Sequence, residues 1–379
     1  MYLQTFFSWI KGHWIQFDKS PRNIYFLLKK HRNVVFFLAG FLFDAITIDR
    51  IDAWTDITIQ IVYLAGLSFL LVYQYRANNG YWTPQKPWLN RLWQFNVEAL
   101  HFLYGGLLSA YVILYLKSTS GARTFIFLLL LIFLLIINEM PQIRRFGYRL
   151  RLGLYAFCVS SFMIYFVAIL IGRMGQWIFY LSLLISVALV WMMATLLAAK
   201  EENKKKSRIR LFLPAGGLFA LLIVLYQLRL IPPVPLSIQY QGIFHHVLRN
   251  DNIFRLRYPK PPFYAFWRKD SQPFMSRPED SIHYFTRIFA PSRFKTKVKV
   301  RWEFYDERKK KYITTDVIPL EVIGGRAEGF RGYVNKSNYD PGSWRVSTET
   351  QVGQTVGYVK FRVKPDNPKK QRTWVDLNM

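Results

Sequence analysis

Long apolar runs in residues 1–228 constrain this chain more than any other feature of its sequence. A helix needs about 20 mostly apolar residues to cross a bilayer, and somewhat fewer where flanking side chains reach the interface. Seven runs meet this need, at residues 34–48, 57–73, 100–116, 124–137, 152–171, 176–197 and 211–228. The sequence therefore predicts a membrane α-helical bundle of about seven spans within residues 21–228. The first and fourth runs are short, so a tilted or re-entrant pair is an alternative.

The segments between these runs alternate in basic charge. Counted from the N-terminus, the segments that precede the seven spans carry 6, 1, 3, 2, 4, 1 and 6 Lys and Arg residues. Short loops rich in Lys and Arg stay on the cytoplasmic side of a membrane. The alternation therefore predicts a multi-pass protein with a cytoplasmic N-terminus and, after an odd number of spans, a C-terminal region outside the cytoplasm.

Polar and aromatic residues near the ends of the spans are the first functional candidates. Residues 1–20 carry apolar and aromatic side chains at helical spacing, which predicts an interfacial amphipathic helix.

Ionisable side chains at membrane depth are costly unless paired or hydrated, and four lie near span ends: Asp44, Glu98, His101 and Glu139. Interfacial or helix-packing roles are the alternative, and no span is interrupted in mid-membrane in the manner of a transporter core.

The sequence pattern changes after residue 228. Pro232, Pro233 and Pro235 predict a stiff link over residues 229–236. Residues 237–364 then alternate with period two, which predicts an extracytoplasmic, all-β, sandwich-like domain. Its strands are expected near residues 237–244, 253–258, 282–289, 295–301, 312–322, 344–349 and 357–363. The one cysteine, Cys158, lies in an apolar run, so no disulfide within the chain is expected. Residues 365–379 are predicted to form a basic C-terminal tail.

One predicted strand carries a row of positive charges. Lys295, Lys297, Lys299 and Arg301 share one face of the strand at about 6 to 7 Å spacing, which is costly in a sheet unless the row is solvated at an edge or matched by anions. An edge strand protected by lysines is one interpretation. The other is a binding surface for an anionic partner.

A glycine- and arginine-rich motif follows at residues 324–333 (GGRAEGFRGY), with residues 338–346 (NYDPGSWRV) behind it. Upstream stretches agree with it, among them 40–44 (GFLFD), 231–236 (IPPVPL) and 287–291 (RIFAP). Together these resemble the DUF2914 family of bacterial membrane proteins, whose function is unknown. The resemblance implies a protein of the bacterial cytoplasmic (inner) membrane with an exported β-domain.

The arginines of this motif suit recognition of an anion. Guanidinium groups beside aromatic faces bind carboxylates, phosphates or sugar rings, and the motif offers both kinds of side chain: Arg326, Arg331, Arg345, Tyr333 and Trp344. With the Lys295–Arg301 row they are predicted to form one electropositive surface. The alternative is structural, with the arginines pairing with Glu328 and Glu349 to hold the domain together.

Recognised catalytic, nucleotide-binding and metal-binding motifs are missing from the sequence, and the six histidines lack metal-ligand spacing. We therefore expect no enzyme activity, cofactor or metal. The net charge of +28 would suit nucleic acid, but it divides between cytoplasmic loops and an exported domain, so no nucleic-acid partner is expected.

The predicted function is non-enzymatic. Besides the lipid bilayer, the expected partners of the exported domain are an anionic lipid, an envelope glycan or an acidic protein. A transporter or lipid-handling protein with an accessory β-domain is the alternative. A membrane enzyme that uses the four ionisable residues near the span ends is a third hypothesis.

Overall fold

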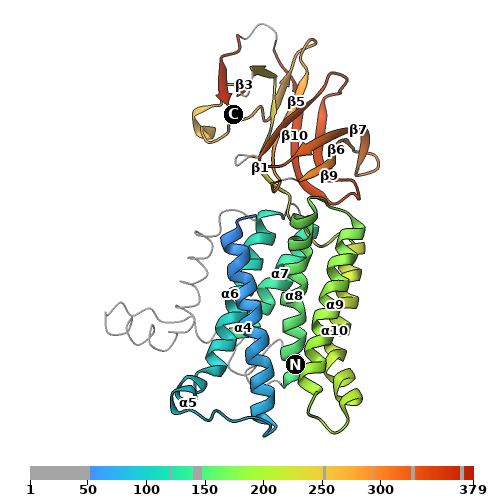
Figure 1. The fold of residues 1–379 in the computed structure, drawn as a ribbon. Helices are drawn as coiled ribbons and strands as arrows, with labels where there is room; N and C mark the ends of the chain where they lie inside the picture. Colours follow the sequence, from blue (N-terminus) through green and yellow to red (C-terminus); the bar gives the residue numbers. More distant parts are fainter. Residues whose placement is uncertain are drawn as a thin grey trace, which may run out of the picture. The chain divides into compact units, whose positions relative to one another are not determined.

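The computed structural model describes residues 52–119, 122–139, 147–250, 253–292, 294–325, 329–367 and 371–379. Within these residues, helices are followed by a β-rich C-terminal region (Figure 1), which confirms the predicted order of the two classes of structure. The predicted interfacial helix at 1–20 and the first predicted span at 34–48 lie outside the described residues.

The described helices account for the apolar half of the chain. They are α4 (Trp54–Asn78), α5 (Pro87–Trp93), α6 (Asn96–Lys117), α7 (Ala122–Glu139), α8 (Tyr148–Ile171), α9 (Gln176–Ala198) and α10 (Lys204–Gln227). Of these, α4, α6, α8, α9 and α10 are long and apolar enough to cross a membrane, and α7 contains a shorter apolar stretch, Thr124–Leu135. Each of the six predicted spans that fall in described residues overlaps one of these helices.

Local sequence explains where these helices begin and end. The Asn203 side chain accepts a hydrogen bond from the backbone N–H of Lys206 (3.1 Å) and so caps the start of α10. Gly172 ends α8 in a left-handed conformation, with φ of 71°, that other residues adopt at a cost. The prolines of the link follow α10 and prevent its continuation.

Helices α4 and α8 are joined by hydrogen bonds as well as by apolar packing. The Tyr165 hydroxyl donates to the side-chain oxygen of Gln60, and both residues are buried. Further along the same pair of helices, Ser68 contacts Tyr155 (2.8 Å) and Arg151 donates to Gln74 (2.8 Å). In an apolar environment such contacts fix which helix faces pack together.

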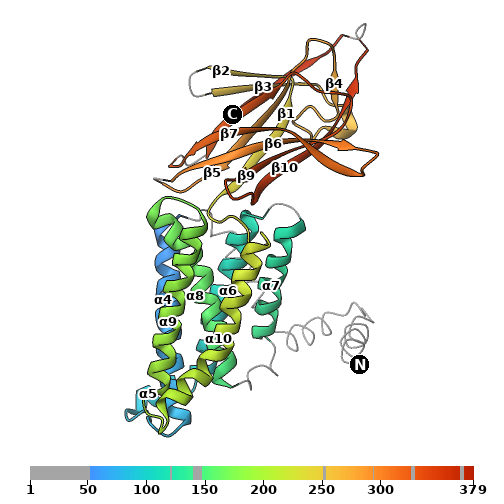
Figure 2. The same ribbon diagram turned by 90° about the vertical axis from the view of Figure 1, so that its right-hand side faces the viewer.

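The described residues of the C-terminal region form three sheets. Figure 2 shows their strands. Their strands are β1 (Ser237–Phe244), β2 (His246–Asn250), β3 (Ile253–Pro259), β4 (Phe274–Ser276), β5 (Ile282–Phe289), β6 (Lys295–Asp306), β7 (Lys311–Ile323), β8 (Phe330–Lys336), β9 (Gly342–Thr350), β10 (Thr355–Pro365) and β11 (Trp374–Asn378). The strand orders are β1-β5-β8, β4-β10-β9-β6-β7 and β11-β3-β2. All seven strands expected from the sequence are present.

Aromatic and β-branched side chains from different sheets share the cores of this region. One core combines Tyr284 of β5 with Trp302 of β6 and Phe361 of β10, so the first two sheets pack through their inner faces. A second core joins Phe244 and Phe285 to the third sheet.

The sequence places residues 365–379 in a tail, but the described part of this range contains β11. This strand pairs with β3, and Val375 and Leu377 pack against the second core. The alternation of Trp374, Asp376 and Asn378 with these apolar residues is too short a signal to predict a strand without its partner.

Hydrogen bonds connect the helix ends to the β-region at three places in the described residues. Asp52, which precedes α4, accepts from the backbone N–H of Ser292 (3.2 Å). The carbonyl of Gly172 accepts from the backbone N–H of Lys295 (3.0 Å), and the Gln354 side chain donates to the carbonyl of Ile231 (3.3 Å). The segment before α4, the α8–α9 loop and the link thus contact the β-region.

Candidate functional site

The outward face of the five-stranded sheet concentrates positive charge. Antiparallel register aligns outward-pointing residues of neighbouring strands: Arg301 lies opposite Ser347, Glu303 opposite Arg345, and Arg345 opposite Lys360. Eight basic residues therefore share this surface, hereafter the basic face: Lys295, Lys297, Lys299, Arg301, Arg345, Lys360, Arg362 and Lys364. Three carboxylates share it, those of Glu303, Glu321 and Glu349.

Two of those carboxylates hold two arginines of the basic face in place. Arg345 donates to both oxygens of Glu303 (2.6 and 2.8 Å), and its guanidinium lies 4.4 Å from the centre of the Tyr312 ring. The hydrogen bonds to Glu303 raise the pKa of Arg345 above its ordinary value. Arg301 donates to Glu349 (3.0 and 3.2 Å). Both arginines therefore have a structural role. The alternative interpretation expected Arg345 to pair with Glu328 or Glu349, but its partner is Glu303, and Glu349 pairs with Arg301.

The lysines of the row differ in their partners. Lys295 forms an ion pair with Glu321 (3.3 Å) in which both side chains are well exposed. Lys299 donates to the backbone carbonyl of Gln351 (3.4 Å). For Lys297, the described part of the chain supplies no ion pair or hydrogen bond to the side chain, and this residue is exposed. The row is thus partly matched by carboxylates on neighbouring strands.

The interpretation of this row as an edge strand is wrong, because β6 lies between β9 and β7 in the sheet. A strand read alone does not reveal its neighbours, and the glutamates that offset the row, Glu321 and Glu349, are far from it in sequence.

Strand β10 adds three basic residues that the sequence interpretation missed. Lys360, Arg362 and Lys364 are exposed, and none has an ion pair among the described residues. Lys360 lies 5.9 Å from the centre of the Tyr312 ring. A signal for them was present, since Val359, Phe361 and Val363 occupy the inner face and the residues between them must point outward.

The remaining predicted binding residues do not all share this face. Trp344 is buried and donates to the carbonyl of Asp340 (2.9 Å), so it belongs to the core. Arg331 and Tyr333 lie on β8, in the three-stranded sheet β1-β5-β8. Arg326 lies outside the described residues. The structure therefore brings Arg345 together with the lysine row but places Arg331 and Tyr333 elsewhere.

The four intramembrane candidates are only partly described. Glu98 and His101 occupy the first two turns of α6, and Glu139 is the last residue of α7. Asp44 lies outside the described residues. Neither pocket found in the described part of the chain has Glu98 or His101 in its lining. Likewise, the residues that the structure describes contain no group of three or more His, Cys, Asp or Glu side chains that suits a metal ion.

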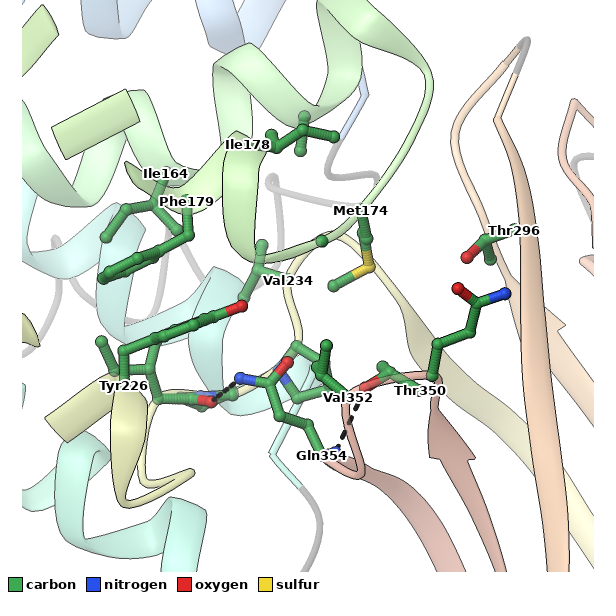
Figure 3. A pocket seen from close by; sticks show the side chains of 16 residues that line it. Ile164, Met174, Ile178, Phe179, Tyr226, Val234, Thr296, Thr350, Val352 and Gln354 are labelled. Carbon is green, nitrogen blue, oxygen red and sulfur yellow. Dashed lines mark hydrogen bonds between the residues drawn. The ribbon is translucent and has the colours of Figure 1, made fainter. Parts of the chain in front are cut away.

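A small cavity lies near the ends of α8, α9 and α10, beside the link and the β9–β10 hairpin (Figure 3). Its volume is about 70 Å³, whereas sites for small-molecule ligands usually measure about 300 to 1,000 Å³. Phe179 stacks on Tyr226 at its wall, with ring centres 3.8 Å apart, and Gln354 bonds to Thr350 and Ile231 beside it. This cavity is a packing gap where the helix ends meet the hairpin.

Comparison with known proteins identifies one family. Residues 295–363 match the model of the family described as "Protein of unknown function (DUF2914)", which confirms the family predicted from the motif. The matched range spans β6 to β10 and so contains nearly all of the basic face.

Comparisons with curated proteins and with solved structures give no further information about fold or function. No curated protein matches the chain. A solved structure of the Pseudomonas fluorescens alkylpurine DNA glycosylase AlkC bound to DNA containing an abasic site analog is similar at 9% identity, over 83% of this chain and 100% of that one. Its TM-score of 0.18 is too low to support any argument about fold or function.

Proposed function

We propose that this DUF2914-family chain is a non-enzymatic, multi-pass protein of the bacterial inner membrane whose exported β-region binds an anionic component of the cell envelope. The observation that carries the proposal is the composition of the basic face. Its three glutamates are engaged by Arg345, Arg301 and Lys295, which leaves a formal excess of five positive charges on one side of one sheet.

The free charges of this face are the binding groups in our proposal. Lys297, Lys360, Arg362 and Lys364 are exposed and have no carboxylate partner in the described residues. Like charges on one face repel, so their presence favours a bound anion over an empty surface. Lys360 lies close to Tyr312 and Tyr358, whose rings provide flat apolar surface beside the charge.

Extracytoplasmic placement of this region is supported by the charge of the loops that contact it. The segment 49–56 and the α8–α9 loop at 172–175 carry one basic residue each and meet the β-region through Asp52 and Gly172. The segment 198–210, at the opposite end of α9 and α10, carries six. Basic loops mark the cytoplasmic side, so this distribution favours a C-terminal region outside. The shared core of the first two sheets favours a sandwich-like architecture for it.

Binding is tested with the full chain in detergent, with dextran sulfate as a polyanionic glycan and uncharged dextran as its control. Replacement of Lys297, Lys360, Arg362 and Lys364 by Gln should weaken dextran sulfate binding about tenfold or more at low salt, because each lost contact removes an attractive charge. The matched control variant replaces Arg255, Lys260, Arg268 and Lys269, exposed basic residues outside the basic face. It has the same net charge and should bind nearly as the parent does.

Two results would count against the proposal. Equal weakening in both quadruple variants would show that net charge alone attracts the glycan. The second result uses two fusions to the C-terminus, one of alkaline phosphatase and one of a fluorescent protein. An inactive phosphatase together with a fluorescent second fusion would place the β-region in the cytoplasm.

A further inference from the structure

A second pocket lies at the end of the helices opposite the α8–α9 loop. Its volume is about 530 Å³, within the range of ligand sites in proteins. Residues from three helices and one loop line it: Tyr75 of α4, Tyr148 and Arg149 of α8, Glu201 of the α9–α10 loop, and Ser207 and Arg210 of α10. We call it the interfacial pocket, because these residues lie within about two turns of the helix ends.

Two arginines give the interfacial pocket its positive charge. Arg149 and Arg210 are exposed, and neither has an ion pair or hydrogen bond to a described residue. The one carboxylate in the lining, Glu201, accepts a hydrogen bond from the Tyr75 hydroxyl (2.6 Å) and is thereby held by α4. Guanidinium groups bind phosphate through strong, charge-assisted hydrogen bonds, so a pocket lined by two of them suits a phosphate group.

Apolar residues next to the arginines indicate what kind of phosphate compound fits. Leu150, which follows Arg149 and lines the pocket, is 45% exposed, and Leu213, one turn beyond Arg210 along α10, is 71% exposed. The helices that carry these leucines, α8 and α10, are both long and apolar enough to cross a membrane. A molecule with its phosphate between the arginines would therefore have its apolar part along α8 and α10, at the depth of acyl chains.

We propose that the interfacial pocket binds the headgroup phosphate of an anionic phospholipid. Basic pockets between membrane helices bind such headgroups in other proteins, and Lys and Arg side chains near the membrane surface attract anionic lipids. The site is independent of the basic face, since it shares no residue with the β-region. The competing explanation is that Arg149 and Arg210 only mark the cytoplasmic side of the helices, which requires no bound lipid.

The test uses native mass spectrometry of the full chain in detergent with added phosphatidylglycerol or uncharged phosphatidylcholine. The double variant Arg149→Gln/Arg210→Gln should lose phosphatidylglycerol affinity about tenfold or more, and phosphatidylcholine binding should not change. The matched control, Lys204→Gln/Lys205→Gln, removes two exposed charges from the same end of α10 outside the pocket lining and should bind as the parent does.

Three results would overturn the proposal. If the double variant binds phosphatidylglycerol as well as the parent does, the two arginines do not form the lipid site. If the lysine control loses as much affinity as the double variant, the loss reflects net charge and not a specific site. Displacement of the lipid by inorganic phosphate, with a thermal shift that depends on Arg149 and Arg210, would assign the pocket to a soluble phosphate compound. If the double variant does not purify, Arg210→Gln alone carries the same prediction, because its exposed side chain supports no described packing.

Discussion

The helical region and the β-region satisfy their polar groups in different ways. Between α4 and α8, two contacts join neutral groups, Gln60 with Tyr165 and Ser68 with Tyr155, and a charged donor, Arg151, bonds to the neutral side chain of Gln74. On the five-stranded sheet, the contacts join opposite charges, as in Arg345 with Glu303. Pairs of opposite charge thus lie on the surface of the sheet, whereas the described contacts between these two helices do not pair opposite charges.

The difference follows from the solvent that each region is expected to meet. Two neutral groups that hydrogen-bond to each other are tolerated in hydrocarbon, whereas transfer of a charged group into hydrocarbon costs several kcal/mol or more of free energy. Water screens exposed charges, so ion pairs on a sheet surface carry little risk and contribute little stability. We therefore expect the stability of the β-region to come from its aromatic core and that of the helix pairs to depend more on each buried hydrogen bond.

The largest effect is expected at Trp302, which is fully buried in the core shared by two sheets. Trp302→Ala should lower the free energy of unfolding of the β-region by about 3 to 5 kcal/mol, because it leaves a large cavity. Hydrogen–deuterium exchange of the full chain measures this as lost protection in β6 and β9. Protection in α4 and α8 should not change if the two regions are stabilised separately.

Trp302→Phe is the matched control. The indole N–H of Trp302 is buried without a hydrogen-bond partner in the described residues, so its removal relieves a desolvation penalty of about 1 to 3 kcal/mol. This gain offsets part of the lost volume. If Trp302→Phe destabilised the region as much as Trp302→Ala does, the core would not be the source of its stability.

A smaller effect is expected at His245, a neutral polar group buried within the β-region. Its Nε2 donates to the carbonyl of Met275 (3.1 Å), so Nδ1 accepts from the hydroxyl of Ser271 (2.9 Å). Burial lowers the pKa of His245 to about 4. Between about pH 6.5 and 4 the unfolded chain therefore binds a proton that the folded chain does not. Stability should fall by roughly 3 kcal/mol as the pH falls across this window.

Asp270 opposes this dependence and allows a sharper test. Burial raises the pKa of Asp270 to about 6, so its contribution is present at low pH and is lost as the pH rises through 6. Thermal unfolding of Asp270→Asn should therefore show a steeper loss of stability in acid than the parent, and His245→Gln a shallower one. Identical pH profiles for the three proteins would contradict the buried neutral histidine.

The sequence predicts the fold of this chain better than it predicts the site. Apolar run length and period-two alternation are local properties, so the described helices and the seven strands followed from them. Strand β11 was missed because its pairing with β3 joins residues more than a hundred positions apart. Tertiary pairing of this kind leaves no local signal.

The site was predicted only in part for the same reason. The lysine row was visible as a run of charge, but Glu321 and Glu349, which partly neutralise it, and the position of β6 inside the sheet depend on register. Tyr75 and Glu201 meet across 126 residues, so the interfacial pocket could not be inferred from spacing. Arg149 and Arg210 were counted as markers of topology, because the sequence does not show that one cavity contains both.

The smallest effects on stability are expected from the loss of single contacts, one in each region. Tyr165→Phe removes the donor to Gln60 between α8 and α4, and the loss of a buried hydrogen bond between membrane helices should cost about 0.6 to 2 kcal/mol. Lys295→Gln removes an ion pair in which the two side chains are 69% and 48% exposed, and should cost about 0 to 1 kcal/mol. Unfolding in mixed micelles at two salt concentrations measures both, and salt should reduce only the effect of Lys295→Gln, because the helix contact carries no charge. A larger loss for Lys295→Gln than for Tyr165→Phe would mean that surface charge stabilises this protein more than its helix contacts do, and the contrast between the two regions would have to be reversed.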